Sequence, residues 1–182
     1  HTCIVCAYEE RYDFVPALEL LPGDVNGDGI TELPRAVLMA GYKDTSSSDA
    51  VYMLDWYAYG IGKVPAKVAT TYQNISDAWS LLIDQKWHDR ITAIKANDGG
   101  LSYVEFFEYR KNKMSIPLFN IYCATGSNRE YYAERTDLIQ LGQTTQAIYF
   151  AKLTNEGEQS ELALTGDEIK ARFSLVNQAW NN

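Results

Sequence analysis

The sequence is poor in the residues and short motifs on which many catalytic sites depend. It holds two histidines and three cysteines in 182 residues. It contains no Gly-x-Gly-x-x-Gly segment, no P-loop, and no Gly-x-Ser-x-Gly segment around a nucleophile. No apolar run approaches the roughly 20 residues that a membrane-spanning helix needs. These absences disfavour nucleotide-dependent enzymes, serine hydrolases of the common type and integral membrane proteins.

Basic side chains are also scarce, with 16 Lys and Arg against 24 Asp and Glu, so the formal net charge is -8. Nucleic acids and anionic lipids attract clustered Lys and Arg. We therefore expect no nucleic-acid partner, and membrane association only through an anchor outside this chain. Hydrophobic residues make up 46% and aromatic residues 13%, which is enough for a packed core. The acidity is uneven, because residues 1–64 alone carry a net charge of -6.

Short runs of β-branched and aromatic residues, separated by turn residues, indicate an antiparallel arrangement. We predict an α+β fold in two parts: a β-meander over 1–73, resembling a propeller blade, and an antiparallel sheet with packed helices over 74–182. Asn97-Asp98-Gly99-Gly100 is typical of a hairpin turn, because these residues tolerate positive φ. The predicted strands are 2–8, 13–20, 35–42, 51–59, 64–72, 78–83, 91–96, 102–110, 117–123 and 147–153.

Two helices are expected in the second part. A short one opens near Asn128 and runs to about Arg135. The clearer one follows Thr165, because Glu168 stands three residues on, at the spacing of a capping box. Helical spacing of apolar residues then predicts that this helix continues through Ile169, Phe173, Val176 and Trp180.

One segment carries a metal-binding pattern. Asp24, Asn26, Asp28 and Glu32 occupy positions 1, 3, 5 and 9 of a glycine-rich loop, and the carbonyl of Ile30 stands at position 7. Calcium prefers six to eight oxygen ligands, and alternate residues of a tight loop can converge on one ion. Three carboxylates within nine residues repel one another without a cation. The alternative is a merely polar loop of Asx turns.

The pattern differs from an EF-hand at its end. Position twelve is Arg35 where a bidentate Glu should stand, and strand-like runs rather than helices flank the loop. The loop is more similar to the calcium loops of β-propeller repeats of the FG-GAP kind, which run directly into a strand. We therefore expect a structural Ca²⁺ rather than a catalytic one.

The cysteines and the ionisable groups give weaker indications. Cys3-Ile4-Val5-Cys6 has the spacing of a redox pair or half a zinc site, but a second ligand pair is missing. Buried thiols, with Cys123 among them, are the better interpretation. His88 precedes Asp89 in a turn, where neighbouring side chains seldom aim at each other. Glu105 and Glu108 are three apart in a strand, so they face opposite sides.

Two further runs of residues are candidates for exposed surface. The aromatic run Trp56-Tyr57-Ala58-Tyr59 is able to stack on sugar rings, but a mixed core and surface strand is the better interpretation. The basic run Arg110-Lys111-Asn112-Lys113 is typical of a solvated hairpin end.

Several segments together resemble a group of uncharacterised secreted lipoproteins of clostridia-like Gram-positive bacteria. The resemblance implies an N-terminal propeller-like region, a PsbP-like α+β module, export, and a lipid anchor on a cysteine upstream of this chain. It implies no activity. The segments that carry it are 24–34, 55–57, 77–83, 86–87, 117–122 and 164–168 with Phe173.

We predict a non-catalytic extracellular or cell-surface module that is stabilised by calcium and serves binding or assembly. Its partner would be a glycan or another surface protein. One alternative is a hydrolase-type enzyme whose site lies between the two halves and uses His88 or clustered carboxylates. The other is an inhibitor or immunity-type partner protein.

Overall fold

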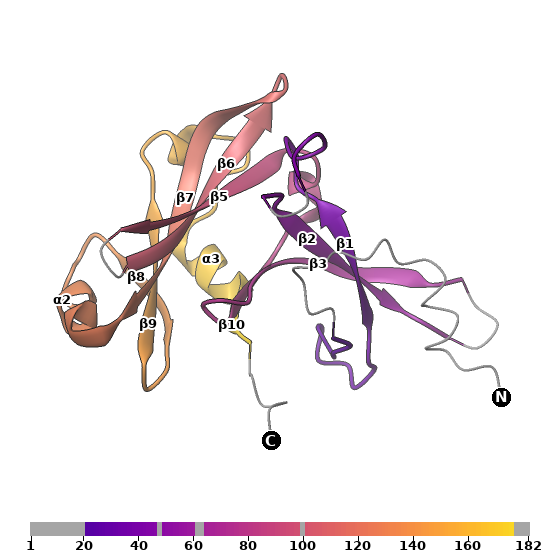
Figure 1. Cartoon of the computed structure of the whole chain (residues 1–182), viewed down its shortest axis with the longest axis horizontal. Coiled ribbons are helices and arrows are strands. Elements are labelled where there is room, and N and C mark those ends of the chain that lie inside the picture. The colour runs from indigo at the N-terminus through magenta and orange to yellow at the C-terminus, as the bar shows by residue number, and fades with distance from the viewer. Residues whose placement is uncertain (1–20, 47–48, 61–63, 99–100, 177–182) are drawn as a thin grey trace.

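The described part of the chain forms two five-stranded antiparallel sheets, as a computed structural model of the protein shows (Figure 1). The structure describes residues 21–46, 49–60, 64–98 and 101–176. Strands account for 50% of the structure and helical segments for 14%. The predicted strands 2–8 and 13–20 lie outside the described residues.

The first sheet, here called sheet 1, has the order β1-β2-β3-β4-β10. Its strands are β1 (Leu33–Leu38), β2 (Tyr52–Ala58), β3 (Ala66–Asn74), β4 (Trp79–Leu82) and β10 (Phe173–Leu175). Four of them follow one another along the chain as a meander. The fifth strand arrives from the far end of the sequence, and Ser174 pairs with Ser80.

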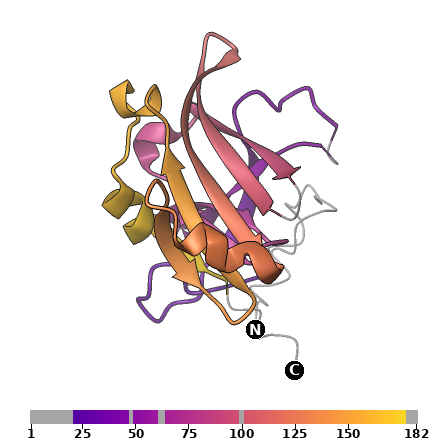
Figure 2. The same ribbon diagram turned by 90° about the vertical axis from the view of Figure 1, so that its left-hand side faces the viewer.

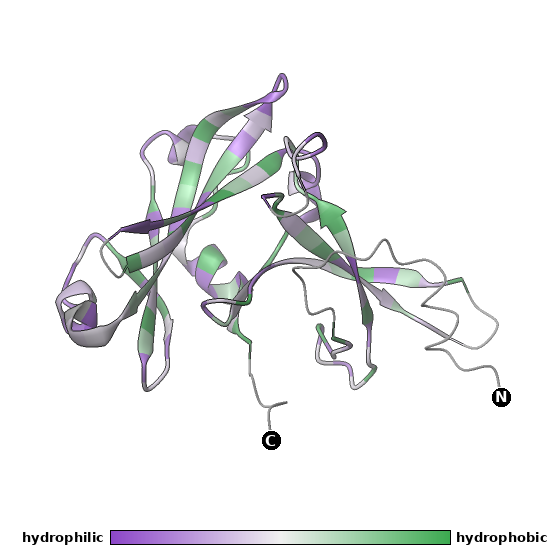
Figure 3. Cartoon of the chain, viewed as in Figure 1, coloured by the Kyte–Doolittle hydropathy of each residue, from purple (hydrophilic) through white to green (hydrophobic). Residues whose placement is uncertain are grey.

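The second sheet, sheet 2, has the order β5-β6-β7-β9-β8. Its strands are β5 (Ile91–Asp98), β6 (Leu101–Arg110), β7 (Lys113–Thr125), β8 (Ile139–Gln143) and β9 (Ala147–Leu153). In Figure 3, apolar bands alternate with polar ones along β6 and β7, and the tip of their hairpin is hydrophilic. This alternation places one face of the sheet on the core.

Helical segments in the described residues are short. The 3₁₀ turns are η1 (Gln85–Trp87), η2 (Gly126–Asn128) and η3 (Gly157–Gln159), and the α-helices are α2 (Arg129–Ala133) and α3 (Gly166–Arg172). Figure 1 shows α3 between the two sheets, and Figure 2 shows α2 in front of the strands of sheet 2.

The predicted α+β class with packed helices is therefore wrong, and the fold is β-rich. The capping box of Thr165 and Glu168 forms as predicted, but the helix ends at Arg172. The next residue, Phe173, is extended and pairs with Leu81 of β4. Its ring also packs against Trp79, at a centroid distance of 5.9 Å. Strand pairing and aromatic burial at this point outweigh the helical spacing of apolar residues.

One hydrophobic core joins the two sheets. Tyr72 of β3 meets Phe106 of β6 edge to face at 5.3 Å, and Phe106 stacks on Phe119 of β7 at 4.8 Å. Trp87 of η1 is fully buried beside Phe119, and its indole N–H donates to the carbonyl of Leu162. The predicted division after residue 73 falls within β3, and it stays a prediction.

The other predicted strands of the described residues are confirmed within a few residues at their ends, and β5 and β6 form the predicted hairpin. Strands β8 and β10 were not predicted. The run 110–113 lies at the turn between β6 and β7, as expected.

Candidate metal centre

The loop that carries the calcium pattern is closed at its base by an isolated antiparallel bridge. The amide of Gly23 donates to the carbonyl of Glu32 at 3.0 Å, and the amide of Glu32 donates to the carbonyl of Gly23 at 2.8 Å. Glu32 immediately precedes β1. Residues 24–31 therefore form a closed loop directly before β1, the first strand of sheet 1.

Asp24 organises the first half of this loop. Its Oδ1 accepts the amides of Gly27 at 2.7 Å and Asp28 at 3.2 Å, and its Oδ2 accepts the amide of Gly29 at 2.9 Å. Both glycines have positive φ, +76° and +82°, a conformation that side chains with a Cβ rarely adopt. The sequence thus coils the chain tightly around one carboxylate.

Asn26 and Asp28 form hydrogen bonds with each other in the second half of the loop. The amide of Asp28 donates to Asn26 Oδ1 at 3.1 Å, and Asn26 Nδ2 donates to Asp28 Oδ2 at 2.9 Å. The amide of Ile30 donates to Asp28 Oδ1 at 2.8 Å. The side chains of Asp24, Asn26 and Asp28 all belong to exposed residues, so their oxygens stay accessible from solvent.

Glu32 differs from Asp24 and Asp28 because it is fully buried, with 0% exposure. Its Oε2 accepts the amide of Val25 from inside the loop at 2.9 Å. Its Oε1 is buried and has no hydrogen-bond partner. An unpaired oxygen of a buried carboxylate is costly, because water no longer solvates it.

The base of the loop lies beside the tryptophan of β2. A methyl group at Gly23 would lie 3.8 Å from the Trp56 ring, and this indole is 5% exposed. Its N–H donates to Thr71 Oγ1 at 2.9 Å. Because Trp56 is buried in this way, the hypothesis that it stacks on sugar rings is not supported.

The donor set of the loop suits a hard cation, since all five predicted ligands offer oxygen. The carboxylates are not yet gathered around one point, however. Within residues 21–46, 49–60, 64–98 and 101–176, no three His, Cys, Asp or Glu side chains form a ready group for a metal ion. Binding would require Asp24, Asn26 and Asp28 to turn oxygen lone pairs toward Glu32, while Ile30 offers its carbonyl.

The structure places the other candidate residues away from this loop. His88 Nδ1 lies 3.2 Å from Asp89 Oδ2, so these neighbours do contact, contrary to expectation, and Asp89 is strongly exposed. Cys123 is buried on β7 and is not in a disulfide. Burial, with the nearby charge of Asp77, raises the pKa of its thiol to about 11. Cys3 and Cys6 lie outside the described residues.

A buried carboxylate lies on β6, and its burial is not apparent from the sequence. Glu108 is fully buried and accepts hydrogen bonds from Arg90, Arg110 and Ser160. Burial alone would raise the pKa of Glu108, but the hydrogen bonds from Arg110 and Ser160 outweigh it and lower the pKa below its usual value. Glu105, by contrast, is partly exposed and contacts Asn120.

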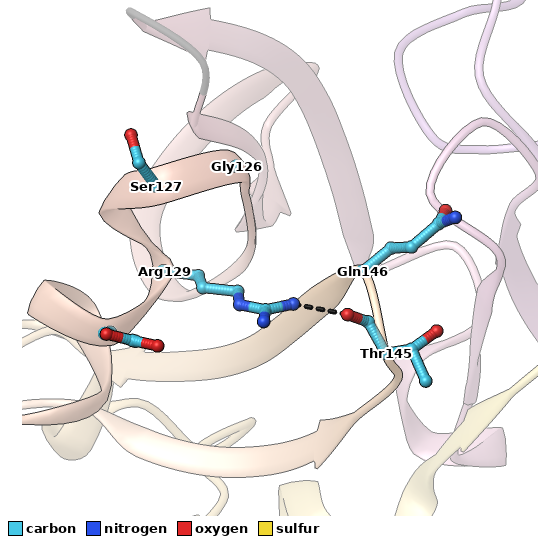
Figure 4. Close-up of a pocket in the computed structure, with 6 residues that line it drawn as sticks. Gly126, Ser127, Arg129, Thr145 and Gln146 are labelled. Atoms are coloured by element: carbon cyan, nitrogen blue, oxygen red, sulfur yellow. Dashed lines mark hydrogen bonds between the residues drawn. The ribbon is translucent and has the colours of Figure 1, made fainter.

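An open recess lies between the η2–α2 segment and the turn before β9 (Figure 4). Arg129 reaches across it and donates to the carbonyl of Thr145, while Ser127 and Gln146 point away from this bond. The guanidinium thus closes the turn onto the helix, and it serves a structural purpose here.

Comparisons of the chain with protein-family models, with curated proteins and with solved structures give no match. None of the helices in the described part of the chain is long and apolar enough to span a membrane. The resemblance to secreted lipoproteins stays a prediction.

Proposed function

We propose that this chain is a non-catalytic, calcium-stabilised module of the extracellular surface of a Gram-positive bacterium, used for binding or assembly. The observation that carries the calcium part is the buried Glu32, whose Oε1 has no partner beside a loop of oxygen donors. A divalent cation at this point supplies that partner. It also relieves the repulsion among Asp24, Asp28 and Glu32.

The energetic consequence depends on calcium outside the cell. Calcium sites of extracellular modules bind with dissociation constants of about 10⁻⁴–10⁻³ M. A ligand present at 100 times its dissociation constant stabilises the folded state by about 2.7 kcal/mol, and by less when it is scarcer. With a dissociation constant of that order, calcium would tie the start of β1 to the preceding chain only where calcium is abundant.

The test is a calcium titration by calorimetry together with thermal melting. We expect saturable binding and a rise in Tm for the wild-type chain, and loss of both in Asp28→Ala. Asp44→Ala is the matched control, since this aspartate is also exposed but lies in the loop after β1. The calcium proposal fails if the wild-type melting temperature does not respond to calcium, or if Asp28→Ala responds as the wild type does.

The fluorescence of Trp56 gives a local readout, because its ring lies beside Gly23 at the base of the loop. Its emission should change with calcium in the wild-type chain, and the change should disappear in Trp56→Phe while the calorimetric signal persists. The lipid anchor, the hydrolase-type alternative and the inhibitor or immunity-type alternative stay predictions. The full-length precursor tests the first, and activity and pull-down assays test the others.

A further inference from the structure

Two arginine side chains at one end of sheet 2 lie side by side because one buried carboxylate holds both. Arg90 Nη2 and Arg110 Nε donate to the same oxygen, Glu108 Oε1. Glu108 is fully buried, and its second oxygen accepts from Ser160 Oγ at 2.7 Å. The arginine side chains are 42% and 44% exposed. In the part of the chain that the structure describes, the two Nη atoms of Arg110 have no acceptor, so they are available to an external one.

A carboxylate of the chain itself already binds one of these arginines from the solvent side. Glu161 Oε2 accepts from Arg90 Nη2 at 2.9 Å, and the Glu161 side chain is 76% exposed. The neighbouring Asp89 contacts His88 instead. An ion pair as exposed as that of Glu161 contributes little to folding, because water solvates both charges well. The contact therefore shows which acceptor the arginine suits, and an external carboxylate can displace Glu161 at small cost.

The turn beside these arginines carries a lysine in an unfavourable backbone conformation. Arg110 pairs with Lys113, so Lys111 and Asn112 form a two-residue turn, and their φ angles are 50° and 58°. Asn and Gly tolerate positive φ, whereas the Cβ of a lysine makes it costly. Strained residues of this kind cluster at functional sites. Among the described residues the ammonium groups of Lys111 and Lys113 make no ion pair, so the turn presents two unpaired positive charges.

Charge complementarity indicates the class of partner. These groups, here called the basic tip, are Arg90, Arg110, Lys111 and Lys113 with the carboxylates Glu108 and Glu161. Four positive and two negative charges give the basic tip a net charge of +2, in a chain whose formal net charge is -8. Figures 1 and 2 show the end of the β6–β7 hairpin projecting beyond the other strands. Nucleic acids need a wider positive surface than this, so a short acidic segment of a protein fits better.

We propose that the basic tip is a docking surface for an acidic segment of another protein, whose carboxylates bind Arg90, Arg110 and Lys111 and displace Glu161. Glu108 is the positioning residue, because it holds the two guanidinium groups from the buried side. Met114 directly follows Lys113 and is 44% exposed, so it offers an apolar contact to the same segment. This surface is separate from the proposed calcium site and does not depend on it.

The experiment titrates an acetylated and amidated hexaglutamate peptide into the full chain by calorimetry, with a hexaserine peptide as the neutral control. We expect binding of hexaglutamate alone, weakening as salt is added because salt screens exposed charges. Lys111→Ala should lower the affinity about two- to fivefold. Lys95→Ala is the matched control, since this exposed lysine lies on β5 outside the basic tip, and it should leave the affinity unchanged. Glu161→Gln should raise the affinity about two- to fivefold, because the competing carboxylate is gone.

A glycine at the strained position separates binding from folding. Lys111→Gly should melt at a higher temperature than Lys111→Ala, because glycine accepts positive φ, and yet it should bind hexaglutamate as weakly. The proposal is overturned if hexaglutamate binds no more tightly than hexaserine, or if Lys111→Ala and Lys95→Ala bind it alike. It is also overturned if Glu161→Gln binds no more tightly than the wild type. A single-stranded oligonucleotide that binds more tightly than hexaglutamate would assign the basic tip to phosphates and overturn the acidic protein segment as its partner.

Discussion

Replacing Glu108 by Gln should destabilise the protein by about 2–3 kcal/mol. The carboxylate is fully buried and accepts from Arg90, Arg110 and Ser160. Hydrogen bonds to a charged group contribute about 1.5–3 kcal/mol each, and neutral ones about 1 kcal/mol. The Gln side chain keeps one acceptor oxygen. Its NH₂ group, however, faces donors that bonded to the second carboxylate oxygen and now lack an acceptor. The arginine side chains are 42% and 44% exposed and stay hydrated, which holds the estimate below that for a fully buried ion pair.

The matched control is Glu105→Gln, three residues earlier on the same strand. Glu105 lies on the opposite face, is partly exposed, and has one long hydrogen bond from Asn120 at 3.3 Å. Its replacement should change the free energy of unfolding by less than about 0.5 kcal/mol.

The pH dependence tests the charge rather than the shape of the side chain. The pKa of Glu108 is lowered in the folded state, since the hydrogen bonds outweigh burial. Its contribution is therefore complete above the unfolded pKa of about 4.3 and is lost as the pH falls through the lower folded value. The stability difference between wild type and Glu108→Gln should be constant near neutral pH and shrink below about pH 4.

The assay is urea unfolding followed by tryptophan fluorescence, since Trp79 and Trp87 are buried in the core. It is repeated across the acid range for both variants and the wild type. A stabilising role of the buried Glu108 charge is refuted if Glu108→Gln is as stable as Glu105→Gln at neutral pH. It is equally refuted if the loss in Glu108→Gln persists undiminished at acid pH, because the carboxylate charge would then not be responsible.

Three further predictions concern the core and the helix cap. Tyr72→Phe should leave the free energy of unfolding unchanged or raise it by about 1 kcal/mol, because the buried hydroxyl has no hydrogen-bond partner. A decrease of more than about 1 kcal/mol in urea unfolding would contradict this. Thr165→Ala should cost about 1 kcal/mol by removing the cap of α3, and Thr165→Ser should restore it; equal Tm values for all three chains would rule out the cap. Cys123 should react with iodoacetamide only after unfolding, because its thiol is buried and its pKa is raised to about 11; rapid alkylation of the native chain would show the burial to be wrong.

The sequence predicts elements well where the information is local. Alternation of apolar residues marks β6, and Asn and Asp near glycine mark the turn before it. The coiling of residues 24–31 follows in the same way from Asp24 and its spacing to Gly27 and Gly29. In each case the residues that decide the conformation lie within a few positions of one another.

The features that the sequence does not reveal depend on distant partners. Phe173 continues a helical pattern, yet it becomes part of β10 because β4 lies beside it with an unfilled edge. Glu108 looks like a surface residue of an amphipathic strand until Ser160, 52 positions later, is brought against it. The burial of Glu32 likewise depends on folding of the whole sheet. Local spacing predicts the candidate metal ligands but not which one of them becomes buried.

The pairing of β4 with β10 has a consequence for how the chain is made. Ser80 and Ser174 are in hydrogen-bond contact although 94 positions separate them in sequence. During synthesis from the N-terminus, β4 therefore emerges long before β10, and the β4 edge that pairs with β10 stays open until residues 173–175 have been made. An open strand edge invites pairing with other chains. Truncation just before residue 173 should accordingly yield an aggregating product, even though nine of the ten described strands would be intact.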